Sequence, residues 1–459
     1  MADTASSPQL KRVMGPGLLL LFIVGDILGT GIYALTGKVA NEVGGAVWLP
    51  FLLAFLVAVI TAFSYLELVT KYPQAAGAAL YTHKAFGIHV LTYMVTFTVM
   101  SSGITSASTA ARAFSANLVE AFDLDFGDGI GITGVGLTFM LAVALVNLRG
   151  VGESVKTNVV LTCVELSGLL IIIMIGMWAL GIGQGDFSRV LDIDTGDRSV
   201  FGAVVAGTAL AFFAMVGFED SVNMAEECKN PSRIFPKVLL AGLGITGLIY
   251  VLVSVTAIAL VPPGDLGSGD TPLLKVVEAG APAFPVGIFA FITMFAVANT
   301  ALINMLMASR LLYGMAREGV LPAALGRVHP ARRTPYVAIV FTTLLAFGLI
   351  TFVGEVPELG GTTALLLLIV FAIVNVAVLV LRRRPAEHQH FRAPTILPVL
   401  GAASCIFLVS PLVERPAAQY RIAAVLLGIG GVLWLITWLS AKRRGGRGPT
   451  VDPERPAQK

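Results

Sequence analysis

The chain has 459 residues, of which 56% are hydrophobic and only 13% are charged, and its formal net charge is +3. A soluble domain usually carries about 25% charged residues, so this composition, with a mean hydropathy of +0.85, excludes an ordinary soluble protein and predicts an integral membrane protein. The three cysteines show no CxxC spacing and indicate neither a metal site nor a disulfide framework. We expect no cofactor and no nucleic-acid partner.

About 20 apolar residues cross a bilayer as one helix. The sequence predicts twelve such spans, at 14–36, 46–70, 88–118, 130–148, 157–180, 200–228, 236–261, 285–309, 337–353, 362–381, 394–413 and 420–440. The first run lacks the cleavage site of a signal peptide and is expected to remain a span. We expect residues 1–440 to form one twelve-helix domain and residues 441–459 to form a disordered, basic cytoplasmic tail.

The distribution of charge predicts the orientation. Most of the 31 Lys and Arg residues fall before the first span, in the even-numbered connections and in the tail, whereas odd-numbered connections such as "EAFDLDFGD" are acidic. Because cytoplasmic loops carry the excess of positive charge, both termini are predicted to be cytoplasmic. We expect a multi-pass protein of the plasma membrane.

Two of the predicted spans contain glycines and acids where an intact helix needs neither. The first span has Gly29 and Gly31 within "GDILGTGIY", and the sixth has Gly217 followed by Glu219 and Asp220. Irregular backbone at membrane depth is tolerated where it lines a cavity. Spans one and six begin two repeats of five spans, so the second repeat is inverted, and matched breaks of this kind mark the central site of a secondary transporter.

The chemistry of such breaks suits an amino acid. Free N–H groups at a half-helix N-terminus attract a carboxylate, and free carbonyl groups attract an ammonium. The alternative is that the glycines only allow close helix packing.

Four motifs give the chain a family resemblance. They are "GDILGTGIY", "ELVTKYPQAAGAALYTHKAFG", "GFEDSVNMAEECKNPSRIFPK" and "ASRLLYGMAREGVLP". With these motifs in this order the chain resembles the amino acid–polyamine–organocation (APC) permeases. The resemblance implies an all-α fold with a five-plus-five inverted repeat (LeuT-like), with helices 1 and 6 broken. The first repeat covers about 14–180, the second about 200–381, and two extra helices about 394–440.

The resemblance also implies function. Such proteins are transporters and not enzymes, and they take up or exchange amino acids by alternating access, often coupled to protons and without ATP. Gly29, Thr30 and Gly31 are expected to hold the substrate carboxylate, and the carbonyls around 214–217 its ammonium.

Three further side chains in the sixth span are candidates for substrate contact. Phe213 and Phe218 are candidate aromatic lids, with ordinary packing as the alternative. Asp220 stands where relatives often carry small residues, and it could favour cationic substrates.

Three acids are candidates for proton coupling. Glu219 can take up and release a proton in a low-dielectric site, or it can be held ionised by backbone hydrogen bonds. Glu165 replaces a lysine that some proton-coupled relatives carry, and it is a proton site, a charge partner for the substrate or a remnant cation site, unless it merely pairs with Thr162 or Asn158. Asp26 either contacts substrate or caps freed backbone N–H groups.

Charged residues at the membrane boundaries are candidate gates. Glu67 and Lys71, with Glu226, Glu227 and Lys229, are expected to form a cytoplasmic ion-pair layer, or simply a solvated interface. Near the outer end of the third span, Arg112 either closes an outer gate or extends to the interface.

The leading interpretation is a proton-coupled amino acid permease in membrane lipid. The four acids within the predicted spans favour cationic amino acids or polyamines as substrates. Protons could instead neutralise these acids, so that neutral substrates are carried. An exchanger, a neutral amino acid permease, a non-transporting sensor and a channel are the alternatives. The sequence gives neither the substrate side chain, the stoichiometry nor the oligomeric state.

Overall fold

The structure, a computed structural model, describes residues 14–74, 77–124, 130–149, 155–196, 198–317, 319–332, 334–385 and 388–443. Within these ranges the regular structure is helical, and extended pairing is limited to two isolated bridges, Met14 with Cys228 and Gly44 with Ile193. The all-helical prediction is therefore confirmed for the described residues. The predicted tail at 441–459 lies almost wholly outside them.

Ten helical segments in the described ranges are long and apolar enough to cross a membrane. Their helices are α1 (Pro16–Ile27) with α2 (Thr30–Val43), α3 (Trp48–Lys71), α5 (His89–Ala121), α6 (Ile130–Arg149), α7 (Val155–Gly181), α8 (Val200–Ala211) with η2 (Phe212–Met215) and η3 (Asp220–Glu227), α9 (Pro231–Leu260), α12 (Val286–Arg317), α14 (Val356–Leu381) and α16 (Ala417–Arg443). Two shorter apolar helices, α13 (Tyr336–Phe352) and α15 (Ile396–Val409), lie where the ninth and eleventh spans are predicted. The chain is a multi-pass membrane protein.

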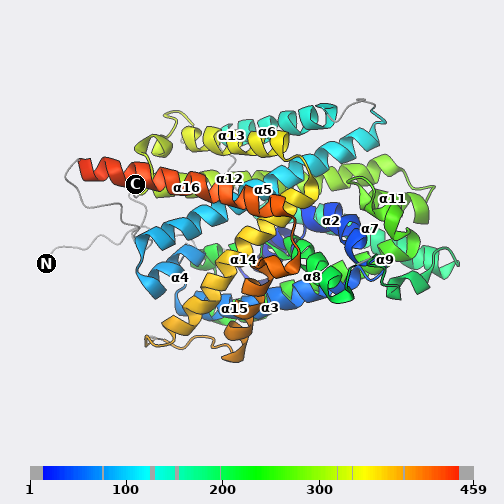
Figure 1. The fold of residues 1–459 in the computed structure, drawn as a ribbon, viewed down its shortest axis with the longest axis horizontal. Helices are drawn as coiled ribbons and strands as arrows, with labels where there is room; N and C mark the ends of the chain where they lie inside the picture. Colours follow the sequence, from blue (N-terminus) through cyan, green and yellow to red (C-terminus); the bar gives the residue numbers. More distant parts are fainter. Residues whose placement is uncertain are drawn as a thin grey trace.

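Several connecting segments also form helices. They are α4 (Gly77–Phe86), α10 (Pro263–Gly267) and α11 (Pro272–Gly280), together with the 3₁₀ turns η1 (Phe187–Leu191), η4 (Ala323–Gly326) and η5 (Pro411–Val413). In Figure 1, α4 and α11 lie toward opposite ends of the molecule. The end where α3 stops and α4 lies is called the Lys71 end below.

Local sequence explains several helix boundaries. Pro16 and Pro231 stand at the start of α1 and α9, where the missing N–H of proline costs no helical hydrogen bond. For this reason α9 begins before the apolar run predicted at 236–261. At its C-terminus α2 stops at Gly44, which has a φ of 67°, a conformation that glycine adopts without a steric penalty.

Contacts between the long helices come in matched sets. α3 packs against α9, α5 against α12, and α6 against α13, so three helices of the first half contact the helix five spans later. Other contacts have a counterpart elsewhere in the chain. The contact of α1 with α7 corresponds to that of α8 with α14. The contacts of α7 with α9 and with α12 correspond to those of α14 with α3 and with α5. Figure 1 shows α5, α12 and α16 running along the long axis of the molecule. Each of the contacts α1–α7, α7–α9 and α7–α12 therefore has a counterpart made by α14.

Candidate functional site

The first long segment is interrupted at Leu28 and Gly29, between the end of α1 and the start of α2. The predicted break at Gly29–Gly31 is thus displaced, because Thr30 and Gly31 already form the first turn of α2. The first N–H groups of a helix have no acceptor within that helix. The start of α2 therefore offers free backbone donors.

The carbonyl side of this interruption is held by another helix. The Tyr250 hydroxyl, from α9, donates a hydrogen bond of 2.7 Å to the carbonyl of Ile27. A Cβ atom on Gly29 would lie 2.6 Å from the hydroxyl oxygen of Thr300 in α12. Close approach of α12 therefore requires glycine at this position.

The sixth span is interrupted over a longer stretch. α8 gives way to η2, then to a turn at Val216–Glu219, and then to η3. Gly217 in the turn has a φ of 124°, which L side chains rarely adopt. Its N–H donates a hydrogen bond of 2.9 Å to Glu219 Oε2. This bond corresponds to the backbone-bonded alternative foreseen for Glu219.

The two interruptions touch each other. A Cβ atom on Gly31 would overlap the backbone of Ala214, and one on Gly217 would overlap the carbonyl of Asp26. These glycines are therefore required by the approach of one interrupted backbone to the other. The contact brings the start of α2 next to the unwound carbonyls of the sixth span.

Four acids gather around this contact. Asp220, Glu219 and Glu165 all lie close enough to Asp26 for their negative charges to repel its charge. Among the described residues, Asp26 Oδ2, Glu165 Oε2 and the Thr30 hydroxyl are buried without a hydrogen-bond partner. An unpaired polar atom in an apolar interior is costly. These atoms therefore mark a place suited to a proton or a polar ligand.

Glu165 is held from α2 and α12. Its side chain is 1% exposed, and Oε1 accepts a hydrogen bond of 3.4 Å from Asn299 Nδ2. The Tyr33 hydroxyl donates to the backbone carbonyl of Glu165 at 2.7 Å. Asn299 and Thr300 were missed as individual site residues, although a polar pair inside an apolar 32-residue helix was the available signal.

The two candidate lid residues have different neighbours. Phe213 lies against Gly360 of α14, where a Cβ atom would come within 3.3 Å of its ring. Phe218 is fully buried and packs edge-on against Tyr65, with ring centroids 5.7 Å apart, and also against Phe371 at 5.3 Å. The contacts of Phe218 match the packing alternative, and both lid roles remain predictions.

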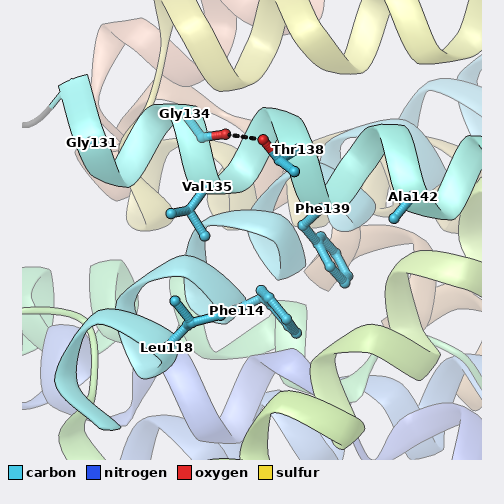
Figure 2. A pocket seen from close by; sticks show the side chains of 8 residues that line it. All are labelled: Phe114, Leu118, Gly131, Gly134, Val135, Thr138, Phe139 and Ala142. Carbon is cyan, nitrogen blue, oxygen red and sulfur yellow. Dashed lines mark hydrogen bonds between the residues drawn. The ribbon is translucent and has the colours of Figure 1, made fainter. Parts of the chain in front are cut away.

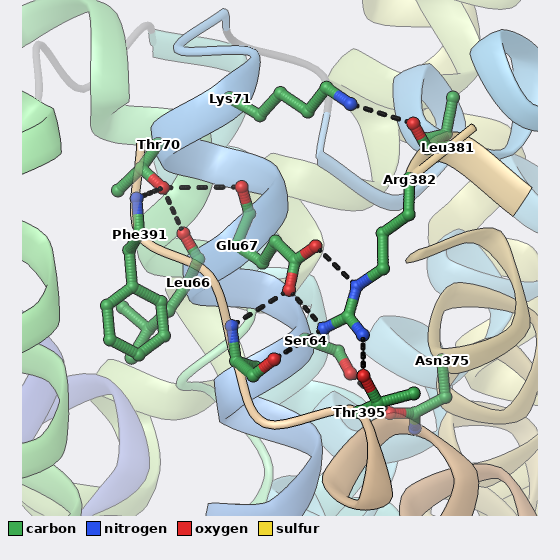
Figure 3. A network of polar contacts seen from close by, with 11 residues as sticks. Ser64, Leu66, Glu67, Thr70, Lys71, Asn375, Leu381, Arg382, Phe391 and Thr395 are labelled. Carbon is green, nitrogen blue, oxygen red and sulfur yellow. Dashed lines mark hydrogen bonds and ion pairs between the residues drawn. The ribbon is translucent and has the colours of Figure 1, made fainter. Parts of the chain in front are cut away.

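A second polar centre lies at the Lys71 end. Figure 3 shows the carboxylate of Glu67 facing the guanidinium of Arg382, with Nε to Oε1 at 2.7 Å and Nη2 to Oε2 at 2.6 Å. The Ala393 N–H adds a third bond to Glu67, of 2.9 Å. Because Arg382 donates hydrogen bonds to the Glu67 carboxylate, the pKa of Arg382 is raised. Here α3 is joined to the segment between α14 and α15.

This arrangement corrects the predicted ion-pair layer. The cation that pairs with Glu67 is Arg382, which follows α14, whereas Lys71 donates to the backbone carbonyls of Leu381 and Arg384 at 2.7 and 2.8 Å. Glu67 and Lys71 are both buried, and charges that cannot reach water need partners close by, donors for the carboxylate and acceptors for the ammonium. The side chains of Glu226 and Glu227 lie outside what the structure describes.

Two other features lie apart from the interruptions. Arg112 in α5 donates to the hydroxyl of Thr133 in α6 at 3.0 Å. Figure 2 shows an open groove between the same two helices, with Phe114, Val135 and Phe139 among its lining side chains. It holds no acid and is not a candidate for the site. In the described residues, no group of three or more His, Cys, Asp or Glu could hold a metal ion.

Comparison with known proteins identifies a family and several relatives. The model of the family described as "Amino acid permease" matches residues 18–433. The chain is 26% identical to a branched-chain amino acid permease of Bacillus subtilis (strain 168), over 89% of this chain and 90% of the relative. It is 27% identical to a methylthioribose transporter of the same organism, over 95% of each chain. It is 29% identical to cationic amino acid transporter 9, chloroplastic, of Arabidopsis thaliana, over 71% of this chain and 59% of the relative.

Proposed function

Because the chain belongs to the amino acid permease family, whose members are transporters and not enzymes, we propose that it carries amino acids into the cell by proton-coupled secondary transport. The observation that carries the proposal is the contact between the two interrupted helices, with Gly31 against Ala214 and Gly217 against Asp26. Free backbone donors and acceptors meet there beside Asp26 and Glu165, each of which has one carboxylate oxygen without a hydrogen-bond partner in the described part of the chain. Both charged groups of an amino acid can be satisfied at one place.

In the proposed binding mode, the substrate carboxylate accepts from the N–H groups at Gly29, Thr30 and Gly31, with the Thr30 hydroxyl as an added donor. A half-helix N-terminus is a favourable anion site. The substrate ammonium donates to the carbonyls of the unwound stretch at 214–217. Phe213, Phe218 and Asp220 complete the proposed contacts with the substrate.

Alternating access follows from the proposed fold. A LeuT-like arrangement has twelve spans, with two inverted repeats of five and two further helices at the C-terminus. The matched sets of helix contacts described above support the repeat. In this proposal one helix group rocks against the other, with both termini in the cytoplasm and the chain in the plasma membrane.

Proton coupling is assigned to Glu219, Glu165 and Asp26. An acid that must enter a dry site is better accommodated when it binds a proton. Repulsion among the four acids strengthens this preference, and a cationic substrate group relieves the same repulsion. Proton binding and substrate binding can therefore influence each other through charge.

The acids favour a cationic amino acid as substrate. The relatives support more than one choice, since they include a branched-chain amino acid permease, cationic amino acid transporters and a methylthioribose transporter. A neutral amino acid permease or an amino acid/polyamine exchanger is the alternative. An exchanger would require substrate on the far side of the membrane.

Uptake into proteoliposomes tests the proposal. Labelled arginine and labelled leucine are offered in turn, with an inward proton gradient that is later collapsed by a protonophore. We expect saturable accumulation that stops on collapse, with arginine preferred. Leucine accumulation without arginine uptake would overturn the cationic assignment, and accumulation that is indifferent to the gradient would overturn proton coupling.

A further inference from the structure

Three buried hydroxyl groups lie between the sixth-span interruption and the Lys71 end. Tyr65 comes from α3, and Tyr81 and Thr82 come from α4. They are 1%, 0% and 0% exposed, and none of the three hydroxyls has a hydrogen-bond partner within the described residues. Buried hydroxyls are nearly always bonded, so three without a partner on the successive helices α3 and α4 require an explanation.

We propose that the Tyr65 and Tyr81 hydroxyls form a proton relay between Glu219 and the Lys71 end of the protein. The relay rests on the proposed function, since it assumes that Glu219 exchanges a proton during transport. The relay adds to that function a route for the proton, formed by residues of α3 and α4.

Tyr65 occupies the first position of this relay. Phe218, which precedes Glu219 in the chain, packs against the Tyr65 ring with centroids 5.7 Å apart, and Glu219 is close enough to act on Tyr65 electrostatically. The Tyr65 ring is edge-on to the Tyr81 ring, with centroids 6.2 Å apart. Tyr65 is therefore next to the acid on one side and next to the second tyrosine on the other.

Aromatic rings close off the remaining sides of Tyr65. Phe218 and Phe371 each pack edge-on against it, with ring centroids 5.7 Å away. These rings supply no hydrogen-bonding atom. The hydroxyls of Tyr65 and Tyr81 are polar atoms that could bind a bridging water, and a buried water needs two to four such partners.

The relay points toward the Lys71 end. Tyr65 precedes the end of α3 by six residues, or roughly 9 Å along the helix. Tyr81 lies on α4, which packs against η3, the segment that follows Glu219. The proton therefore has a short distance to cover before it reaches the membrane boundary.

The transfer conserves protons. Protonated Glu219 gives its proton to the oxygen of the Tyr65 hydroxyl, directly or through one water, while that hydroxyl passes its own proton to a water bridging to Tyr81. Tyr81 repeats the exchange and passes a proton to water at the Lys71 end. One proton leaves Glu219, one proton reaches bulk water, both tyrosines end neutral, and Glu219 becomes a carboxylate.

The test compares proton-driven uptake with substrate counterflow in proteoliposomes. Counterflow needs substrate binding and alternating access but no net proton movement. Tyr65→Phe and Tyr81→Phe each remove one hydroxyl and keep the ring. The control is Tyr93→Phe in α5, because the Tyr93 hydroxyl is buried and already bonded, at 2.9 Å, to the carbonyl of Gly430. Proton entry is followed with a dye inside the vesicles.

We expect Tyr65→Phe and Tyr81→Phe to lower gradient-driven uptake and proton entry about tenfold or more, with counterflow changed less than about twofold. Tyr93→Phe should leave the ratio of the two rates unchanged. The relay is overturned if both variants keep wild-type driven uptake, or if counterflow falls in parallel with it.

One comparison separates the relay from the function on which it rests. If the wild type shows gradient-driven uptake and Glu219→Gln abolishes it while Tyr65→Phe does not, the relay alone is wrong. If the wild type shows no gradient-driven uptake, the proposed coupling fails and the relay fails with it. Melting temperatures of Tyr65→Phe and Tyr81→Phe should stay near wild type, since neither change removes a protein hydrogen bond among the described residues.

Discussion

Gly217 lies directly against the backbone carbonyl of Asp26, and this contact joins the interruption of the sixth span to that of the first. The residues are 191 positions apart in the chain: Gly217 lies in the turn that interrupts the sixth span, and Asp26 lies in the last turn of α1, just before the first interruption. Any side chain at 217 must displace one segment from the other. The contact therefore makes the geometry of the proposed site sensitive to a single methyl group.

We expect Gly217→Ala to disable transport. The added Cβ would overlap the Asp26 carbonyl, and alanine is disfavoured at a φ of 124°. The expected loss is roughly 100-fold in uptake rate, with about 1–3 kcal/mol of stability. Gly244→Ala in α9 is the matched control, since nothing lies within 4 Å of its added Cβ. Equal uptake by the two variants in proteoliposomes would contradict the account.

Removing one member of the Glu67–Arg382 pair should be strongly destabilising. Their side chains are 2% and 11% exposed, and loss of one partner leaves the other charge buried, at a cost of about 3–5 kcal/mol. We expect Glu67→Gln and Arg382→Gln each to lower the melting temperature in detergent. The melting temperature of the double variant should fall by less than the sum of the two single decreases.

An exposed ion pair provides the control for this cycle. Arg198 and Glu42 are 2.6 Å apart, with side chains 39% and 29% exposed, and such pairs contribute about 0–1 kcal/mol. Glu42→Gln should therefore change the melting temperature little. If Glu67→Gln were as mild as Glu42→Gln, the role of the pair in joining α3 to the segment after α14 would be refuted.

Asp220→Asn should change substrate preference. If Asp220 faces a cationic side chain, loss of its charge removes an interaction of about 1.5–3 kcal/mol. The KM for arginine should then rise about tenfold or more, while uptake of leucine changes little. Asp192→Asn at an exposed position is the control. If uptake of arginine and uptake of leucine changed in parallel, Asp220 would not contact the substrate side chain.

Arg415 should resist replacement even by lysine. Its guanidinium donates to the carbonyls of Leu408, Gly361 and Ala209, and to the side chain of Gln419, at 2.8–3.2 Å. One ammonium cannot reach all four acceptors. We expect Arg415→Lys to cost roughly 1–3 kcal/mol, measured as a lower melting temperature.

The pH dependence and the control for Arg415 follow from its burial. Burial lowers the pKa of Arg415 to about 10, and its unfolded value is higher, so stability would rise with pH only above about 10. The contribution of Arg415 to stability in the wild-type protein should therefore be constant throughout the neutral range. Arg421→Lys, at an exposed position, should be neutral, and a comparable loss there would argue against the assigned contacts.

Apolar length predicted the long apolar helices well, because it follows directly from the cost of placing charge in lipid: in the described ranges, ten of the twelve predicted spans are helical segments long enough to cross a membrane, and two are shorter apolar helices. The orientation drawn from the charge pattern stays a prediction. The short helices α4 and α11 were missed, since a segment of about ten residues leaves no membrane-length apolar signal. The first interruption begins one residue and ends two residues before the predicted one, because glycine content does not reveal that Thr30 starts a helix. Partners such as Arg382 for Glu67 lie 315 residues apart, and only packing brings them together.

The position of the substrate is tested most directly by chemical protection at Thr30. Thr30→Cys places a thiol at the start of α2, while the native Cys163 is exposed and Cys228 and Cys405 are buried. A small membrane-permeant thiol reagent is applied with and without saturating arginine or leucine. The account predicts that the transported amino acid slows modification at position 30 and leaves Cys163 unaffected. Equal modification of position 30 with and without that amino acid would contradict a site between the two interrupted helices.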